Sequence, residues 1–137
     1  MLKIKLLKSL VPILLLVIVS YISYRFYLKD IYWNNQTQTI HIDERFDSKV
    51  YELKKHKKQE EPYSLEIEIT GTSKENISFM VGSSPTNMTK KISIKKGEIN
   101  FETVSDWYQE TCFILVQSEG NKRFDLDVNY RFITSAN

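Results

Sequence analysis

The residue types that most often carry out chemistry are sparse in this sequence. His41 and His56 both lie outside metal-ligand spacing of each other and of the single cysteine, so neither has the companions that a zinc site or a catalytic triad needs. Cys112 begins the apolar stretch CFILVQ, and we interpret it as a small buried hydrophobic residue rather than a reactive thiol. The sequence also contains no G-x-S-x-G, H-E-x-x-H or glycine-rich phosphate-binding motif. We therefore expect a protein that is not an enzyme and holds no metal or cofactor.

Acidic and basic side chains occur in short runs that could still bind an ion or a charged partner. Asp125 and Asp127 are two residues apart, as are Glu66 and Glu68, so each pair would project from one face of a strand. Ca²⁺ takes six or more oxygen ligands, and the loops here are not rich in Asp, so we interpret both pairs as the solvated face of a sheet. The run KKHKK at 54–58 is interpreted in the same way, as an exposed basic loop.

The stretch SDWYQETC, residues 105–112, is the most promising binding segment outside the N-terminal region. Trp and Tyr offer an apolar body with a polar tip and are enriched at binding sites. Asp106 could orient the Trp N–H or a ligand hydroxyl beside Trp107 and Tyr108. We therefore name Asp106, Trp107 and Tyr108 as candidate ligand-binding residues. The alternative is that Trp107 covers one end of a hydrophobic core.

The sequence begins with an apolar segment that predicts a membrane helix. The sixteen residues between Lys8 and Arg25 contain no charge, and flanking cations and aromatic rings extend such a segment to the length of a bilayer. The residues that we expect at the membrane interface are Lys5, Lys8, Tyr24, Arg25, Tyr27 and Trp33. Because a small-x-small cleavage site is poorly represented after the apolar run, an uncleaved anchor is favoured over a cleaved secretory signal.

The distribution of charge gives an orientation and excludes one class of partner. Three Lys precede the apolar run, whereas only Arg25 and Lys29 closely follow it, which favours a cytoplasmic N-terminus and a domain outside the cytoplasm. The formal net charge of the whole chain is +2, but residues 30–137 hold 14 Lys/Arg and 17 Asp/Glu, a net of −3. A domain with that charge lacks the basic character of nucleic-acid-binding proteins.

Beyond the anchor, apolar residues alternate with polar ones in short runs that predict strands. The clearest are YSLEIEITG and RFDLDVNYRFI, and turn-forming stretches such as GSSPTN and KKGE separate the runs. About seven or eight such strands in roughly 100 residues predict an all-β domain, an antiparallel β-sandwich of the jelly-roll or immunoglobulin-like type. We expect a basic start (1–8), a transmembrane helix (9–28), a linker (29–37) and the sandwich (38–134).

These features favour a single-pass, membrane-anchored binding module that is not an enzyme. It would present a surface to another protein of the cell envelope or to a glycan. The alternative is an accessory or inhibitor-like subunit of a membrane complex, in which the anchor helix forms part of the interface.

Overall fold

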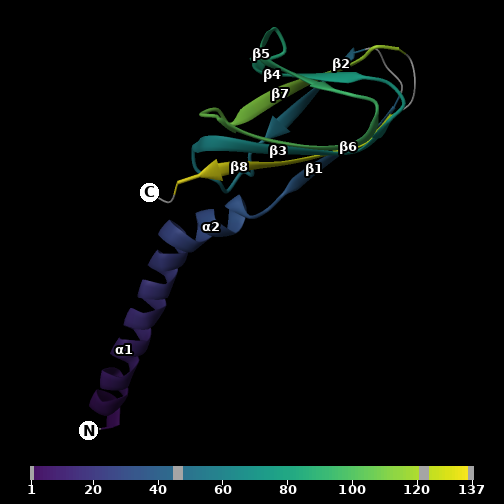
Figure 1. Ribbon diagram of the computed structural model, residues 1–137. Coiled ribbons are helices and arrows are strands. Elements are labelled where there is room, and N and C mark those ends of the chain that lie inside the picture. The colour runs from purple at the N-terminus through teal and green to yellow at the C-terminus, as the bar shows by residue number, and fades with distance from the viewer. Residues whose placement is uncertain (1, 45–47, 121–123, 136–137) are drawn as a thin grey trace.

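The computed structural model describes residues 2–44, 48–120 and 124–135, although the side chains of residues 2–6, Asp30 and Glu44 are not described. A single helical rod leads into a two-layered β-domain, and the rod meets the domain at one end (Figure 1).

The rod consists of three helical segments in direct succession. They are α1 (Leu2–Ser23), the π-helical turn η1 (Tyr24–Leu28) and α2 (Lys29–Asn34). The stretch Leu7–Asn34 has the length and apolar character to cross a membrane, and none of its most apolar window is buried in the protein. Length and composition of this kind are shared by membrane anchors and secretory signals. Residues 29–37, expected to be a linker, are helical as far as Asn34, because contacts with the β-domain described below stabilise this polar turn.

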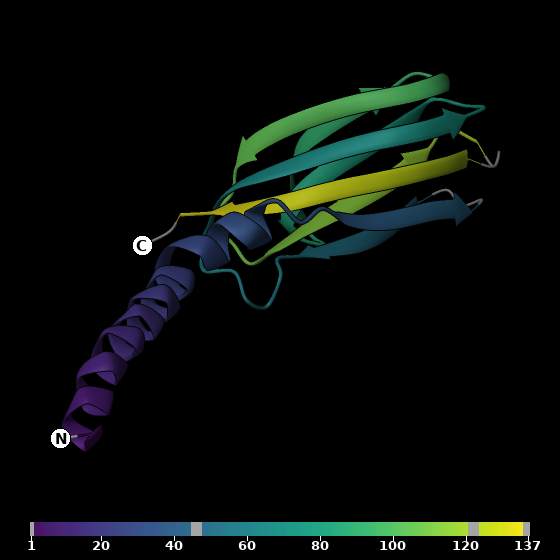
Figure 2. The same cartoon turned by 90° about the horizontal axis from the view of Figure 1, so that it is seen from below.

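Eight strands within the described residues form two antiparallel sheets. The strands are β1 (Gln38–Glu44), β2 (Ser48–Lys54), β3 (Pro62–Ser73), β4 (Ile77–Ser84), β5 (Asn87–Ile94), β6 (Gly97–Asp106), β7 (Thr111–Ser118) and β8 (Phe124–Thr134). One sheet has the order β1-β8-β3-β6 and the other the order β2-β7-β4-β5. The predicted all-β sandwich is therefore confirmed, and the helix leaves from one end of it (Figure 2).

The order of the strands decides between the two predicted types of sandwich. Only β4 and β5 are successive strands that pair with each other, and every other connection passes from one sheet to the other. Eight strands wound between two four-stranded sheets in this way form a jelly roll. Strands that pair are therefore mostly distant in the sequence, as in the pairing of Gln38 with Tyr130.

The core lies between the two sheets and is built from the alternating apolar residues that the sequence shows. Leu65, Ile67 and Ile69 on β3 face Phe79 and other residues across the sandwich. The fully buried core residues include Ile42, Leu53, Leu65, Ile69, Phe79, Ile114, Val116, Phe124, Leu126, Val128 and Phe132. Cys112 is also fully buried, as predicted. Burial raises the pKa of its thiol to about 12, so the thiol stays protonated at neutral pH.

Close backbone packing within the first sheet depends on a glycine in β3. Gly71 has a φ of +137°, and a Cβ atom at this position would lie 2.1 Å from the carbonyl oxygen of Asp125 on β8. Only glycine tolerates both the backbone conformation and the approach of the neighbouring strand.

Candidate functional site

The C-terminal end of the helix is fastened to the sandwich by one asparagine. The Asn34 side-chain amide donates to the backbone oxygen of Thr134 at 2.7 Å. Its oxygen accepts three hydrogen bonds, from the backbone N–H and the hydroxyl of Thr134 and from the side chain of Gln59, at 3.0–3.1 Å. Gln59 is itself buried and also donates to the backbone oxygen of Phe132. Helix, loop and last strand are thus joined without a flexible linker.

The loop that follows β2 packs against the same turn of the helix. The rings of Trp33 and His56 stack with their centroids 3.6 Å apart, and the ammonium group of Lys58 lies 5.3 Å from the centre of the Trp33 ring. Lys55 donates to the backbone oxygen of Gln59 and forms an ion pair with Glu110 at 3.2 Å. The KKHKK run, predicted to be an exposed loop, is exposed at Lys54, Lys57 and Lys58, but Lys55 and His56 are half-buried. Trp33 of the helix covers the ring of His56, whereas Lys55 lies beside Gln59 and Glu110.

The other predicted interface residues remain on the surface of the helix. Lys8, Tyr24, Arg25 and Tyr27 are exposed, whereas Trp33 is half-buried against His56. The side chain of Lys5 lies outside the described residues. An additional ion pair joins the rod to the loop, since the ammonium of Lys29 lies 3.4 Å from a carboxylate oxygen of Glu60.

The end of β6 and the turn after it bring Asp106, Trp107 and Tyr108 together, but in different roles. Trp107 packs against the core, and its indole N–H donates to the backbone oxygen of Thr111 at 3.2 Å, so Asp106 does not orient it. Asp106 is exposed, and 72% of the Tyr108 surface is accessible to solvent. These three residues, with Gln109 and residues of the β4–β5 hairpin, line an open depression of about 280 Å³.

This depression lies at the same end of the sandwich as the helix. The backbone N–H of Trp107 donates to the backbone oxygen of Tyr63 at the start of β3. The preceding residue, Pro62, pairs with Thr134 at the end of β8. Thr134 is the residue that holds Asn34. Figure 1 shows the connection between β6 and β7 at the end of the sandwich that meets α2.

The outer face of the sheet β1-β8-β3-β6 is rich in carboxylates, as the alternation in sequence predicts. His41 lies among them, with Nδ1 2.6 Å from Asp127 and Nε2 3.4 Å from Asp125. The hydrogen bond with Asp127 and the surrounding negative charge raise the pKa of His41 above its usual value. Arg131 forms an ion pair with Glu66 on this face. No group of three potential metal ligands is found among the described residues.

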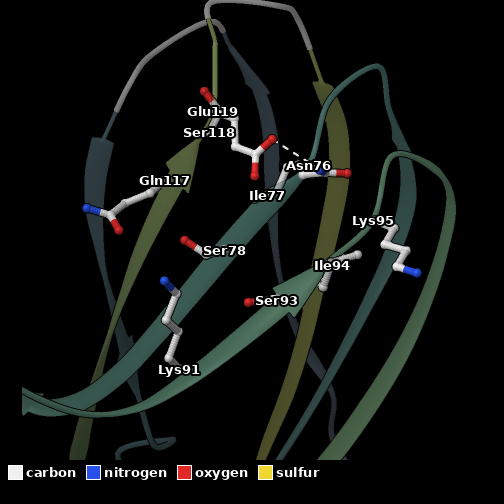
Figure 3. Close-up of a pocket in the computed structure, with 10 residues that line it drawn as sticks. All are labelled: Asn76, Ile77, Ser78, Lys91, Ser93, Ile94, Lys95, Gln117, Ser118 and Glu119. Atoms are coloured by element: carbon white, nitrogen blue, oxygen red, sulfur yellow. Dashed lines mark hydrogen bonds between the residues drawn. The ribbon is translucent and has the colours of Figure 1, made fainter.

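The outer face of the sheet β2-β7-β4-β5 carries a site that the sequence does not indicate. Polar residues from three strands line a groove of about 550 Å³ (Figure 3). Its lining residues include Asn76, Ser78, Lys91, Ser93, Gln117 and Glu119. These residues belong to separate segments of ordinary polar composition, and only the pairing of β7, β4 and β5 brings them together.

No protein-family model matches the sequence, and no curated protein matches it at a significant level. Solved structures match the fold. The pre-peptidase C-terminal domain of a collagenase from Bacillus anthracis aligns with a TM-score of 0.51 at 11% identity, covering 69% of this chain and 89% of that chain. A chain from the disulfide-linked pili of Bacillus endospore appendages gives a TM-score of 0.47 at 8% identity, covering 74% and 94%. A family 35 carbohydrate-binding module from Clostridium thermocellum gives 0.42 at 9% identity, covering 74% and 95%. The first of these likenesses shows that the chain shares the fold of a β-sandwich module.

Proposed function

We propose that this chain is a binding module that is not an enzyme and that a single transmembrane helix holds it at a membrane. In this proposal the sandwich lies outside the cytoplasm and presents Asp106, Trp107 and Tyr108 to another envelope protein or to a glycan. The observation that carries the proposal is the direct fastening of the apolar helix to the sandwich through Asn34, at the end where the exposed Tyr108 lies.

A rigid junction of this kind suits a surface that must face a partner in the same envelope. A tether raises the local concentration of a binding site near its partner. A fixed orientation also reduces the rotational freedom lost on binding, which is part of the free-energy cost of association. The ring of Tyr108 adds an amphipathic contact whose position is set by the core packing of its neighbour Trp107.

Site-specific photo-crosslinking in intact cells tests this proposal. A photoreactive residue replaces Tyr108 in the full-length chain, and the matched control replaces Glu98, which is exposed at the opposite end of β6. We expect a light-dependent adduct at position 108, either protease-sensitive for a protein partner or protease-resistant for a glycan, and none at position 98. Equal adducts at both positions, or none at position 108, would contradict the proposal.

The same junction supports a second function, that of an accessory subunit of a membrane complex. Because the helix and the sandwich are joined by Asn34 and by the Trp33–His56 stack, both would act as one body in an assembly. Replacing residues 9–23 with an unrelated apolar helix of the same length separates the two functions. A tethered binding module retains its crosslink at position 108 after the exchange, whereas a subunit that binds through its helix loses it.

A further inference from the structure

The groove on the sheet β2-β7-β4-β5 is independent of the depression beside Trp107. The groove lies over the start of β4, at Ile77 and Ser78, whereas the depression includes Ser83 at the end of the same strand. This sheet also forms the side of the sandwich away from the helix (Figure 1). A ligand in the groove would therefore approach without obstruction from the anchor.

A row of polar side chains crosses the groove at one level of the sheet. Ser78 on β4 pairs with Gln117 on β7 and with Ser93 on β5. Lys91 lies two residues before Ser93 on β5, opposite Met80. Among the described residues, the structure gives these four polar side chains no hydrogen-bond or ion-pair partner. Two hydroxyls, an amide and an ammonium are thus available to a ligand (Figure 3).

The charges around the groove favour an anionic group in the ligand. Lys91 and Lys95 both line the groove, and the amine of Lys91 points toward Ser78 whereas that of Lys95 points outward (Figure 3). The one carboxylate of the lining, that of Glu119, accepts a hydrogen bond from Asn76 at 3.0 Å. Asn76 is fixed in turn by the backbone N–H of Lys96, which donates to its side-chain oxygen at 3.0 Å. A carboxylate of the ligand is therefore best placed near Lys91, away from Glu119.

An apolar row borders the polar one. Register places Val50, Leu115 and Met80 side by side across β2, β7 and β4, and Met80 lies opposite Lys91 on β5. Leu115 and Met80 are half-buried and Val50 is exposed. A ligand that covers both rows needs hydroxyl groups on one part of its surface and C–H groups on another, a combination that sugar rings provide.

From this arrangement we infer that the groove binds a short saccharide that carries a carboxylate. The hydroxyl and amide groups of Ser78, Ser93 and Gln117 bind the sugar hydroxyls, and Lys91 binds the carboxylate. The volume of about 550 Å³ lies within the range of about 300–1,000 Å³ that is usual for sites of small ligands. A nucleic acid is a poorer match, since residues 30–137 carry a net charge of −3.

Calorimetric titration of the full-length protein in detergent micelles tests the inference. The probes are trimers of galacturonate, mannuronate and guluronate and a sialylated trisaccharide, each compared with its carboxyl-reduced neutral form. We expect at least one acidic probe to bind and its neutral form to bind more weakly. Lys91→Gln is expected to weaken binding about tenfold, through loss of a charge-assisted hydrogen bond. The isosteric change Gln117→Leu should also weaken binding.

The control variant is Lys57→Gln, which makes the same charge change at an exposed lysine in the loop after β2. It should leave the affinity unchanged. The inference is overturned if none of the acidic probes binds, if the neutral forms bind equally well, or if Lys57→Gln weakens binding as much as Lys91→Gln. None of these results alters the crosslinking result at position 108, so a failure here is distinct from a failure of the proposed function.

Discussion

Trp107 and Tyr108 are neighbours in the sequence, but the structure gives them different surroundings. The indole of Trp107 packs against the core and bonds to the oxygen of Thr111, while the ring of Tyr108 extends into solvent. Only Tyr108 can therefore be truncated without removing core packing, and the binding function of this segment should be tested there.

Trp107→Ala should lower the free energy of unfolding of the sandwich by about 3 kcal/mol, near the lower end of measured Trp-to-Ala costs because the ring is only half-buried. Tyr108→Ala should change it by less than about 0.5 kcal/mol, as exposed substitutions usually do. Urea unfolding followed by circular dichroism measures both values. A loss in Tyr108→Ala as large as that in Trp107→Ala would show that Tyr108 is structural.

His41 is the described histidine whose ionisation the structure couples most directly to carboxylates. Its pKa is raised, chiefly by the hydrogen bond with Asp127 and further by the negative charges of Asp127, Asp125 and Asp43. The stabilisation from this pairing is thus fully present below the unfolded pKa of about 6.5. It is lost as the pH rises through the higher folded pKa.

Asp127→Asn should lower the pKa of His41 toward its ordinary value, since the hydrogen bond with the Asp127 carboxylate and one nearby negative charge are removed. NMR titration of the imidazole protons measures the pKa directly. Asp106→Asn, at an exposed position on β6 that does not contact His41, serves as the control and should leave the pKa unchanged. An unchanged pKa in Asp127→Asn would mean that the hydrogen bond is not formed in solution.

At the scale of elements, the helix turn α2 is the part that the sequence pattern describes least well. In the sequence, residues 29–37 resemble a linker. The hydrogen bonds that fix this segment run from Asn34 to Thr134, 100 positions away. A local pattern contains no information on such a partner. In the structure, the side chain of Asn34 and the stacked rings of Trp33 and His56 join α2 directly to the sandwich.

Asn34→Ala should loosen this joint, since it leaves the backbone N–H and the hydroxyl of Thr134 without their acceptor. The expected cost is about 1–3 kcal/mol. Spin labels on cysteines at Tyr27 and Asn100, both exposed, report the distance between helix and sandwich. The native Cys112 is buried and its pKa is raised to about 12, so it should not react with the label.

The distance distribution should be narrow in the native sequence and broad in Asn34→Ala. Asn35→Ala is the matched control, because the side chain of Asn35 donates to the backbone oxygen of Ile31 within its own helix turn and not to the sandwich. An equally broad distribution in the native sequence would refute a rigid joint.

The pairing of β3 with β8 gives a second prediction at this scale. Gly71→Ala should cost more than about 2 kcal/mol, because a Cβ would overlap the backbone of Asp125 and alanine rarely adopts a φ of +137°. Gly97 has a φ of +120° but open space around its Cβ position, so Gly97→Ala isolates the cost of the backbone conformation alone. Equal unfolding temperatures of the two variants would contradict close packing at Gly71.

At the scale of the whole molecule, the two faces of the sandwich differ in character. The outer face of β1-β8-β3-β6 is acidic, with Glu66, Glu68, Glu102, Asp125 and Asp127 among its residues. The other outer face combines lysine, hydroxyl, amide and apolar groups. The helix joins the sandwich at one end, and the sheet β2-β7-β4-β5 lies on the side of the sandwich away from the helix (Figure 1).

The membrane arrangement that we propose predicts the fate of a tag placed after the last residue. In intact cells with the outer barrier opened, protease should remove the tag from a full-length, membrane-bound chain. This result follows if the helix is an uncleaved anchor and the sandwich lies outside the cytoplasm. A protected tag would place the sandwich in the cytoplasm, and a shortened soluble chain would identify the apolar segment as a cleaved signal.

The sequence alone determines the sandwich class, the apolar helix and most of the core. Alternation at residues such as Leu65, Ile67 and Ile69, and burial of the stretch that begins at Cys112, depend on local patterning, which the sequence displays directly. The jelly-roll order, the docking of Asn34 on Thr134 and the groove between Gln117, Ser78 and Ser93 were decided only by the tertiary structure. Each of these joins segments far apart in the chain, and no local period records which strand will lie beside which.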